Sequence, residues 1–247
     1  MFRAESASMS HVADRNQVRI GGGYSRTQRT VETVCLVVFA LAELVTLGRA
    51  ALATPAWWML TMAPAAIVCA AMFADLVSGV VHWGCDTWGA VDTPLLGKAF
   101  IRQFREHHVD PDEINHHDLV EANGTNGGLS LLPVGVAWLL PYDVAHPTPL
   151  AWGTQLGVAV FAFLVTFTSQ AHQWAHAPRV PGWVAWCQRK GIMLSREHHA
   201  VHHEAPHLHN YCITGGWMDA VIERFGLFRR AERLITRVTG TAPRAGQ

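Results

Sequence analysis

The sequence predicts an all-α, polytopic membrane protein with about four transmembrane helices and a histidine-rich helical cap on the cytoplasmic side. Three observations support this fold class. Four long apolar runs divide the chain, charged residues make up only 15% of it against roughly 25% in ordinary soluble domains, and the basic residues are concentrated in particular connecting segments. The formal net charge is zero, which gives no reason to expect a nucleic-acid partner.

The chain begins with a polar segment. The first 30 residues contain five arginines and no apolar core, a pattern typical of a disordered cytoplasmic tail rather than a signal peptide. We therefore expect a tail over 1–30, a membrane domain over 31–240 and a short C-terminal tail over 241–247.

Four apolar runs are candidate membrane spans, and they lie at about 33–53, 56–81, 129–146 and 150–169. A helix needs about 20 apolar residues to cross the hydrocarbon core, and the second and fourth runs meet that length. The third run is the weakest because Pro133 and Pro141 interrupt it, and by itself it is also compatible with a re-entrant segment.

The distribution of arginine and lysine predicts the orientation of the spans. Five basic residues precede the first run, three follow the second, and ten follow residue 170, whereas the loop between the third and fourth runs has none. Basic segments stay on the cytoplasmic side. Both termini are therefore expected in the cytoplasm, and residues 141–150 on the opposite side.

Histidines recur at helical spacing in segments that this topology brings to the cytoplasmic face. In VHWGCDTWG, His82 and Asp86 lie four residues apart, and SQAHQWAH has the same spacing between two histidines. REHHAVHH adds four more histidines, and an HH doublet lies in the first cytoplasmic loop. Side chains at i and i+4 share one helix face and can converge on a metal ion. The histidines concerned are His82, His107, His108, His172, His176, His198, His199, His202 and His203.

Simpler explanations account for each cluster taken alone. A single HxxxH is as often two surface histidines as a metal site, a purification-tag-like tract would be contiguous and terminal, and a pH sensor needs only one or a few histidines. Three separate clusters on one membrane face favour a metal site over these alternatives.

The number of imidazoles points to more than one ion. A structural zinc takes four ligands, and five cysteines without a CxxC pair do not suggest a thiolate site. Soluble di-iron proteins use carboxylates and ExxH motifs inside a helical bundle. The pattern here is typical of a membrane counterpart in which imidazoles replace most carboxylates, so that two irons would reduce O2 and oxidise an unactivated C–H bond.

Several longer motifs resemble one family. HWGCDTWG at 82–89, GKAFIRQFREHHVDP at 97–111, HDLVEANGTN at 117–126, REHHAVHH at 196–203 and YCITGGWMDAVIERFGLFRR at 211–230 are similar to the plasmanylethanolamine desaturases. This family, also called the Kua or lipid desaturase domain family, includes a plant relative that acts on plastid phosphatidylglycerol. The resemblance covers roughly residues 70 to 240.

The resemblance implies a ligand set on this chain. The family's histidine motifs fall on all nine histidines named above, and its HWxxD aspartate falls on Asp86. His207 matches a further histidine, and His116 and His209 lie outside the pattern. The chain departs from the family at Ser169, where an asparagine is usual, and in a short segment between His176 and Trp183.

Three further features are interpreted from the residues. Asp75 lies seven residues before His82 on the same helix face, and we expect it to accept a hydrogen bond from an imidazole N–H. Asn123 and Asn126 could cap the third span or approach the metals, and we expect them to cap the span or to form a turn. Residues 219–238 read as one basic amphipathic helix, suited to an anionic membrane surface or to docking a redox partner.

The resemblance implies an O2-dependent lipid desaturase that introduces a vinyl ether double bond into plasmanylethanolamine. Its substrate would be a phospholipid in the bilayer, and its electrons would come from an external cytochrome b5-like or ferredoxin-like protein. An acyl-lipid desaturase acting near the carboxyl end of a chain and a lipid hydroxylase remain alternatives. A membrane metal sensor or transporter is the non-enzymatic alternative, although transport predicts ionisable residues through the spans rather than on one side.

Overall fold

The computed structural model describes residues 25–90, 92–94, 97 and 101–244. In these ranges the chain forms helices and no β-strand. The all-α class is therefore confirmed. The long helices are α2 (Arg26–Ala51), α3 (Met59–Thr87), α5 (Leu119–Leu139) and α6 (Pro149–Thr166). The shorter ones are α4 (Arg102–Val109), η2 (Glu113–His116), α7 (Thr168–His176), α8 (Gly182–Arg189), α9 (Arg196–His202), α10 (Asp219–Phe225) and α11 (Leu227–Thr239).

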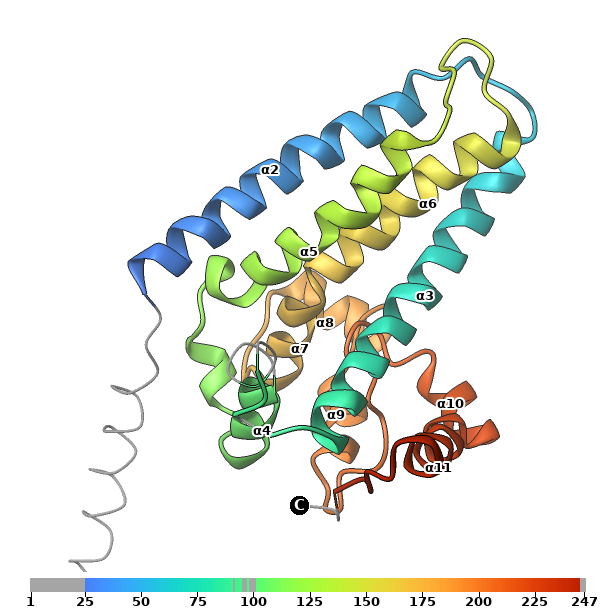
Figure 1. Cartoon of the computed structure of the whole chain (residues 1–247). Coiled ribbons are helices and arrows are strands. Elements are labelled where there is room, and N and C mark those ends of the chain that lie inside the picture. Colours follow the sequence, from blue (N-terminus) through green and yellow to red (C-terminus); the bar gives the residue numbers. More distant parts are fainter. Residues whose placement is uncertain (1–24, 91, 95–96, 98–100, 245–247) are drawn as a thin grey trace, which may run out of the picture.

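The four long helices run side by side, and the short helices collect at one end of them (Figure 1). α5 packs against α2 and α6, and α6 packs in turn against α3. At the end opposite the short helices, the α2–α3 and α5–α6 loops meet, because the Thr54 N–H donates to the Val144 carbonyl at 3.0 Å. The Trp152 indole N–H donates to the Ala50 carbonyl at 2.9 Å at this same end.

Three of the long helices, α2, α3 and α6, are long and apolar enough to cross a membrane. Their outward side chains match that role, since Leu44 of α2 is 67% exposed and Leu60 of α3 is 83% exposed. In a bilayer such surfaces contact lipid tails. α5 is more polar, yet it runs alongside α2 and α6 in the same bundle (Figure 1).

α5 differs from the third span expected at 129–146, because it begins ten residues earlier and ends before Pro141. Its first turn is capped by Asp118, whose carboxylate accepts from the backbone N–H groups of Val120 and Glu121. The polar start of the helix is tolerated because small residues let it approach α2 closely. A Cβ on Gly124 would lie 2.4 Å from the Cβ of Glu32.

The role expected for the two asparagines of this segment was wrong. Both lie inside α5 rather than at its cap. Asn123 is fully buried, and its amide donates to the Leu119 carbonyl at 2.9 Å and to the Gln170 side chain at 3.4 Å. The Asn126 amide donates to the Ser169 hydroxyl at 3.0 Å. These side chains join α5 to α7.

Two other expected boundaries move. α2 begins at Arg26 with Ser25 as its N-cap, so it starts inside the segment assigned to the tail; residues 1–24 and 245–247 lie outside the described residues. The single amphipathic helix expected over 219–238 is two helices, α10 and α11. The chain turns between them at Gly226, whose φ of 56° is readily adopted only by glycine.

The α10–α11 unit packs against the end of α3. Phe228 stacks on Trp83 with ring centroids 4.5 Å apart, and the Trp83 indole N–H donates to the Glu232 carboxylate at 2.9 Å. A small apolar core of Trp83, Tyr211, Cys212, Ile222 and Phe228 forms here. This packing places the C-terminal part of the chain beside the histidine-bearing end of α3.

Candidate metal centre

Four helices bring the clustered histidines together at the end of the bundle. α3 contributes its last turns, α4 and α9 each contribute an HH doublet or part of one, and α7 contributes two histidines one turn apart. The potential ligand atoms form two groups, within each of which the atoms lie within 4.8 Å of one another. The first group consists of His107, His172, His176, His199 and His203, and the second of His82, Asp86, His108 and His202.

The first group is made of imidazoles alone. The Nε2 atoms of His172 and His199 lie 2.8 Å apart, and the Nε2 atom of His203 lies 3.1 Å from those of both His107 and His199. The His176 ring stands edge-on to those of His107 and His199, with centroids 4.5 and 4.7 Å away. The ring nitrogens therefore face a common point.

The second group is built around a carboxylate. The Asp86 Oδ2 atom lies 3.4 Å from His82 Nε2, 3.6 Å from His108 Nε2 and 3.5 Å from His202 Nε2. His82 and His202 are fully buried. Three ring nitrogens and one carboxylate oxygen thus converge from α3, α4 and α9.

Two of the chain's HH doublets are divided between the groups. His107 and His203 belong to the first group, whereas their chain neighbours His108 and His202 belong to the second. Successive residues of a helix differ by about 100° in direction, so neighbouring side chains cannot share one site as i and i+4 residues do. Each doublet therefore places one ring in each group and holds the two groups next to each other.

Backbone carbonyls fix the orientation of two rings in the second group. The His82 Nδ1–H donates to the Tyr211 carbonyl at 3.0 Å, and the His202 Nδ1–H donates to the His209 carbonyl at 2.8 Å. A carbonyl only accepts, so in each neutral ring the proton is on Nδ1 and the lone pair on Nε2. This is the arrangement in which metal-bound histidines are usually held.

Several imidazoles of the ligand groups lie outside the membrane helices, and burial keeps these imidazoles in the neutral form that binds metals. It lowers the pKa of His108 to about 4, that of His176 to about 4 and that of His203 to about 3. Burial also lowers the pKa of His172 and of His199 well below the ordinary value. Neutral imidazole is the form that binds metals.

The donor atoms fit a pair of cations. Among the described residues, His82 Nε2, both carboxylate oxygens of Asp86 and His176 Nε2 are buried without a hydrogen-bond partner. In the second group, lone pairs of His82 and His202 face a carboxylate oxygen, which is unfavourable unless a cation lies between them. A nitrogen-rich set with one carboxylate suits iron among other first-row metals.

His198 has a different position from the other expected ligands. It lies outside both groups, and its Nε2 atom is 2.8 Å from the Asp219 carboxylate. The hydrogen bond with Asp219 raises the pKa of His198. The His198 ring also contacts Gly216, where an added Cβ would lie 2.5 Å from Nε2. It links α9 to the segment before α10.

Asp75 and His207 belong to neither ligand group, and both side chains hydrogen-bond to backbone atoms. We expected Asp75 to accept an imidazole N–H, but its carboxylate accepts the backbone N–H groups of Gly215, Gly216 and Met218 at 2.8–3.0 Å. It thereby anchors the 215–218 segment to α3. His207 packs on His108, with ring centroids 4.6 Å apart, and its Nδ1–H donates to the His202 carbonyl at 3.0 Å.

Several positioning residues were missed at the sequence level. The Arg105 guanidinium donates to the Trp88 and Gly89 carbonyls at 3.0 and 2.8 Å, joining α4 to the end of α3. The Gln173 amide donates to the carbonyls of Ile114 and His117 at 2.7 and 2.8 Å. The Arg196 guanidinium donates to the His176 carbonyl at 2.7 Å. Lone polar residues with backbone partners have no recognisable spacing, so only the fold identifies them.

Comparisons with known proteins agree with this arrangement. A family model described as the lipid desaturase domain matches residues 71–246. The chain is 44% identical to mouse plasmanylethanolamine desaturase 1 over 181 residues, covering 72% of this chain and 67% of the relative. It is 41% identical to the plasmanylethanolamine desaturase of Myxococcus xanthus over 225 residues, covering 90% and 77%. It is 35% identical to the chloroplastic fatty acid desaturase 4 of Arabidopsis thaliana over 176 residues, covering 70% and 52%. No solved structure matches the chain.

Proposed function

The chain belongs to the lipid desaturase domain family, and from this membership we propose that it is a membrane-bound plasmanylethanolamine desaturase. The observation that carries the proposal is the pair of adjacent ligand groups, which can hold two metal ions at one end of an apolar bundle. Two relatives that share 41–44% identity with the chain are named for this activity.

The proposed reaction removes two hydrogens from neighbouring carbons of an alkyl chain. The group –O–CH2–CH2–R, with O2, two electrons and two protons, becomes –O–CH=CH–R and two waters. Four electrons reduce O2, of which two come from the substrate and two from a donor protein. Iron is the metal that we assign to both groups, since bound iron supplies the reduction of O2 that this oxidation requires.

The protein's own contribution is to hold the ligands and to position the substrate. The buried imidazoles of His82, His199 and His202 are almost completely inaccessible to water, which limits side reactions of the oxidant. The carbonyls of Tyr211 and His209 keep two rings oriented before any ion binds. Such pre-organisation allows one methylene pair to be held at a fixed distance from the centre.

The position of the centre supports a reaction close to the lipid headgroup. The ligand groups lie where α3 ends and the short helices begin (Figure 1), and we place this end at the cytoplasmic surface, with both termini cytoplasmic, from the distribution of basic residues. Carbons next to the glycerol backbone lie at that level of a bilayer, whereas mid-chain carbons lie deeper. The first two carbons of an ether-linked chain meet this requirement.

We place the electron donor on the same side. The exposed arginines Arg229, Arg230, Arg233 and Arg237 of α11 form a basic surface near the centre. An acidic cytochrome b5-like or ferredoxin-like protein would be attracted to such a surface. α11 can also rest on anionic lipid through its exposed Leu234 and Val238, as basic amphipathic helices do.

One alternative has support of its own. The 35% identity to a plant fatty acid desaturase favours an acyl chain as a second candidate substrate, oxidised near its carboxyl end. The geometric argument applies equally to both lipids, because in each case the reacting carbons lie next to the glycerol. Only the product distinguishes them.

The test is expression in a bacterial host that lacks plasmalogens and is fed an alkylglycerol. We expect acid-labile ethanolamine lipids that release a fatty aldehyde, with no such product from a His202→Ala variant. Ether lipids that stay saturated while an acyl chain gains a double bond near its carboxyl end would establish the alternative. A product that carries a new hydroxyl group would identify a hydroxylase, and a mid-chain double bond would defeat both desaturase proposals.

A further inference from the structure

Two adjoining cavities lie beside the second ligand group. Each has a volume of about 240 Å³. The inner cavity reaches two members of the group, Asp86 and His108, whereas the outer cavity opens between α10, α11 and residues 208–211. Leu208, Tyr211 and Glu232 line both of them, so the two cavities adjoin, and we refer to them together as the groove.

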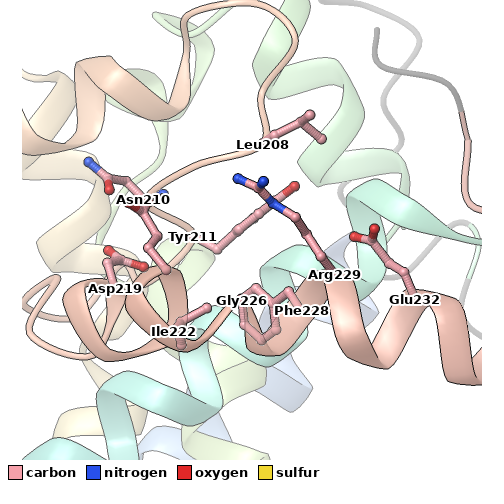
Figure 2. A pocket seen from close by; sticks show the side chains of 10 residues that line it. Leu208, Asn210, Tyr211, Asp219, Ile222, Gly226, Phe228, Arg229 and Glu232 are labelled. Atoms are coloured by element: carbon pink, nitrogen blue, oxygen red, sulfur yellow. Dashed lines mark hydrogen bonds between the residues drawn. The ribbon is translucent and has the colours of Figure 1, made fainter.

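The groove carries charges of both signs along its length. Arg244 lines the inner cavity and Arg229 the outer one, and Glu232 stands between them because it lines both. Figure 2 shows Tyr211, Arg229 and Glu232 around the outer cavity, two of them from α11. The Glu232 carboxylate is held by the Trp83 indole through one oxygen, Oε1, so its negative charge has a fixed position.

The backbone of Arg244 is fixed beside α3. Its backbone N–H donates to the carbonyl of Thr87, the last residue of α3, at 3.0 Å. Thr87 follows Asp86 directly, so the backbone of Arg244, whose exposed side chain lines the inner cavity, lies beside the ligand group. A guanidinium at this place suits a phosphate, which it can contact with two parallel N–H groups.

The proposed reaction places the headgroup within reach of these charges. In plasmanylethanolamine, six single bonds separate the first alkyl carbon from phosphorus, and bonds of about 1.5 Å carry six steps no further than about 8 Å. The ammonium nitrogen follows four bonds beyond phosphorus. When the reacting carbons are at the ligand group, the phosphate and then the ammonium must therefore lie in its immediate surroundings.

We propose that this groove binds the phosphoethanolamine headgroup of the substrate, with Arg244 contacting the phosphate and Glu232 the primary ammonium. The inference rests on the proposed function, since it takes the reacting carbons to be those next to the ether oxygen. A contact between Glu232 and the ammonium would explain why the protein selects an ethanolamine headgroup. A primary ammonium donates hydrogen bonds to a carboxylate, whereas a quaternary ammonium or a glycerol headgroup does not form the same charged hydrogen bond.

The test measures lipid binding without turnover. The full-length, iron-loaded protein is placed in lipid nanodiscs under anaerobic conditions, and native mass spectrometry compares ether lipids with phosphoethanolamine, phosphocholine and phosphoglycerol headgroups. Glu232→Gln removes the charge but keeps an oxygen acceptor for Trp83, and Arg244→Gln removes the cation. Arg224→Gln, a change of an exposed arginine on α10 that lines neither cavity, is the control, and iron content verifies that each variant is folded.

The wild type should prefer the ethanolamine lipid over the glycerol lipid by about tenfold, the scale of one charged hydrogen-bonded contact. Glu232→Gln should lower ethanolamine binding to the glycerol level and leave the glycerol lipid unchanged. Arg244→Gln should weaken all three lipids, and Arg224→Gln none. Equal weakening of every lipid by Glu232→Gln, an unchanged preference in that variant, or no effect of Arg244→Gln would overturn the assignment.

Admitting O2 separates this inference from the proposed function. A Glu232-dependent preference in a protein that forms no vinyl ether would disprove the function and retain the headgroup site. Vinyl ether formation with a headgroup preference that does not depend on Glu232 would support the function and disprove the headgroup site.

Discussion

Neighbouring histidines in this chain have different tasks. His198 and His199 are adjacent on α9, yet the first bonds to Asp219 and the second is buried in the five-imidazole group. His202 and His203 are divided between the two groups. A motif read as HHxxHH therefore contains one link to the 215–219 segment and three candidate ligands, and only the direction of each side chain separates them.

Iron analysis of single variants should reveal this division. His199→Ala and His202→Ala each remove a buried ligand, but from different groups. We expect iron in the purified protein to fall from about two ions per chain, with nearly complete loss of activity in both variants, because binding needs a complete set of deprotonated ligands. Elemental mass spectrometry measures the iron.

Two matched variants complete this experiment. His198→Ala should keep the iron of the wild type although it loses the bond to Asp219, and His209→Ala should do the same because only its backbone carbonyl contacts the centre. If His198→Ala lost as much iron as His199→Ala, His198 would be a ligand. Full activity in both His199→Ala and His202→Ala would refute the two groups.

At the scale of the elements, polar residues determine where the helices begin and how they join. α5 starts in a polar segment because Asp118 caps it and because glycines allow close packing against α2. Its asparagines then bond to Gln170 and Ser169, next to the histidines of α7. The orientation of α7 thus depends on polar contacts made inside the bundle.

The Asp118 cap can be tested by substitution. Asp118→Ala should lower the free energy of unfolding by about 1 kcal/mol, a fall of about 2–4 °C in the melting temperature of a chain of this size. Asp118→Asn should lose much less, since its side-chain oxygen also caps. Thermal unfolding in detergent measures both variants, and equal destabilisation would show that the Arg29 ion pair, not the cap, is what matters.

The effect should depend on pH in a defined direction. Hydrogen bonds from the backbone of Glu121 and from Arg29 lower the pKa of Asp118. A carboxyl whose pKa is lower in the folded state than in the unfolded state stabilises the protein at any pH above the unfolded-state pKa of about 3.9. This stabilisation is lost as the pH falls through the folded-state pKa. The difference between wild type and Asp118→Ala should therefore be complete at pH 7 and disappear in strong acid.

At the scale of the whole molecule, the bundle brings two distant sets of histidines to one end. His82 lies in the last turns of α3, and His172 follows α6. Both lie at the same end only if α5 traverses the bundle between them, as it does in the structure (Figure 1). The weak third span is thus essential for the assembly of the centre.

Labelling should reveal the position of the α5–α6 loop. In a variant whose five native cysteines are replaced, Asp143→Cys should react with a membrane-impermeant reagent added from the non-cytoplasmic side. Arg237→Cys on α11 should react only from the cytoplasmic side. Labelling of Asp143→Cys from the cytoplasm would contradict a crossing by α5 and would place His82 and His172 on different sides of the membrane.

The sequence was sufficient for the fold class and for most of the residues that converge. Apolar length reveals α2, α3 and α6, and i, i+4 spacing reveals pairs such as His172 and His176, because both signals are local. The start of α5, the break at Gly226 and the partner of Asp75 depend on contacts between distant segments. The backbone carbonyls of Tyr211 and His209 could not be foreseen, since a carbonyl is present at every residue and only the fold selects these two.

The packing order of the long helices has a consequence for the biogenesis of the protein. α2 and α3 are consecutive in the chain, yet α5 and α6 lie between them, and their loops meet at the Thr54–Val144 hydrogen bond. The contact between the α2–α3 loop and the α5–α6 loop can therefore form only after some 90 further residues have been synthesised, and a ribosome adds about 5–20 residues per second. During those seconds α2 and α3 remain without their final neighbours, and Glu32 and Glu43 lack the surroundings in which the finished bundle buries them.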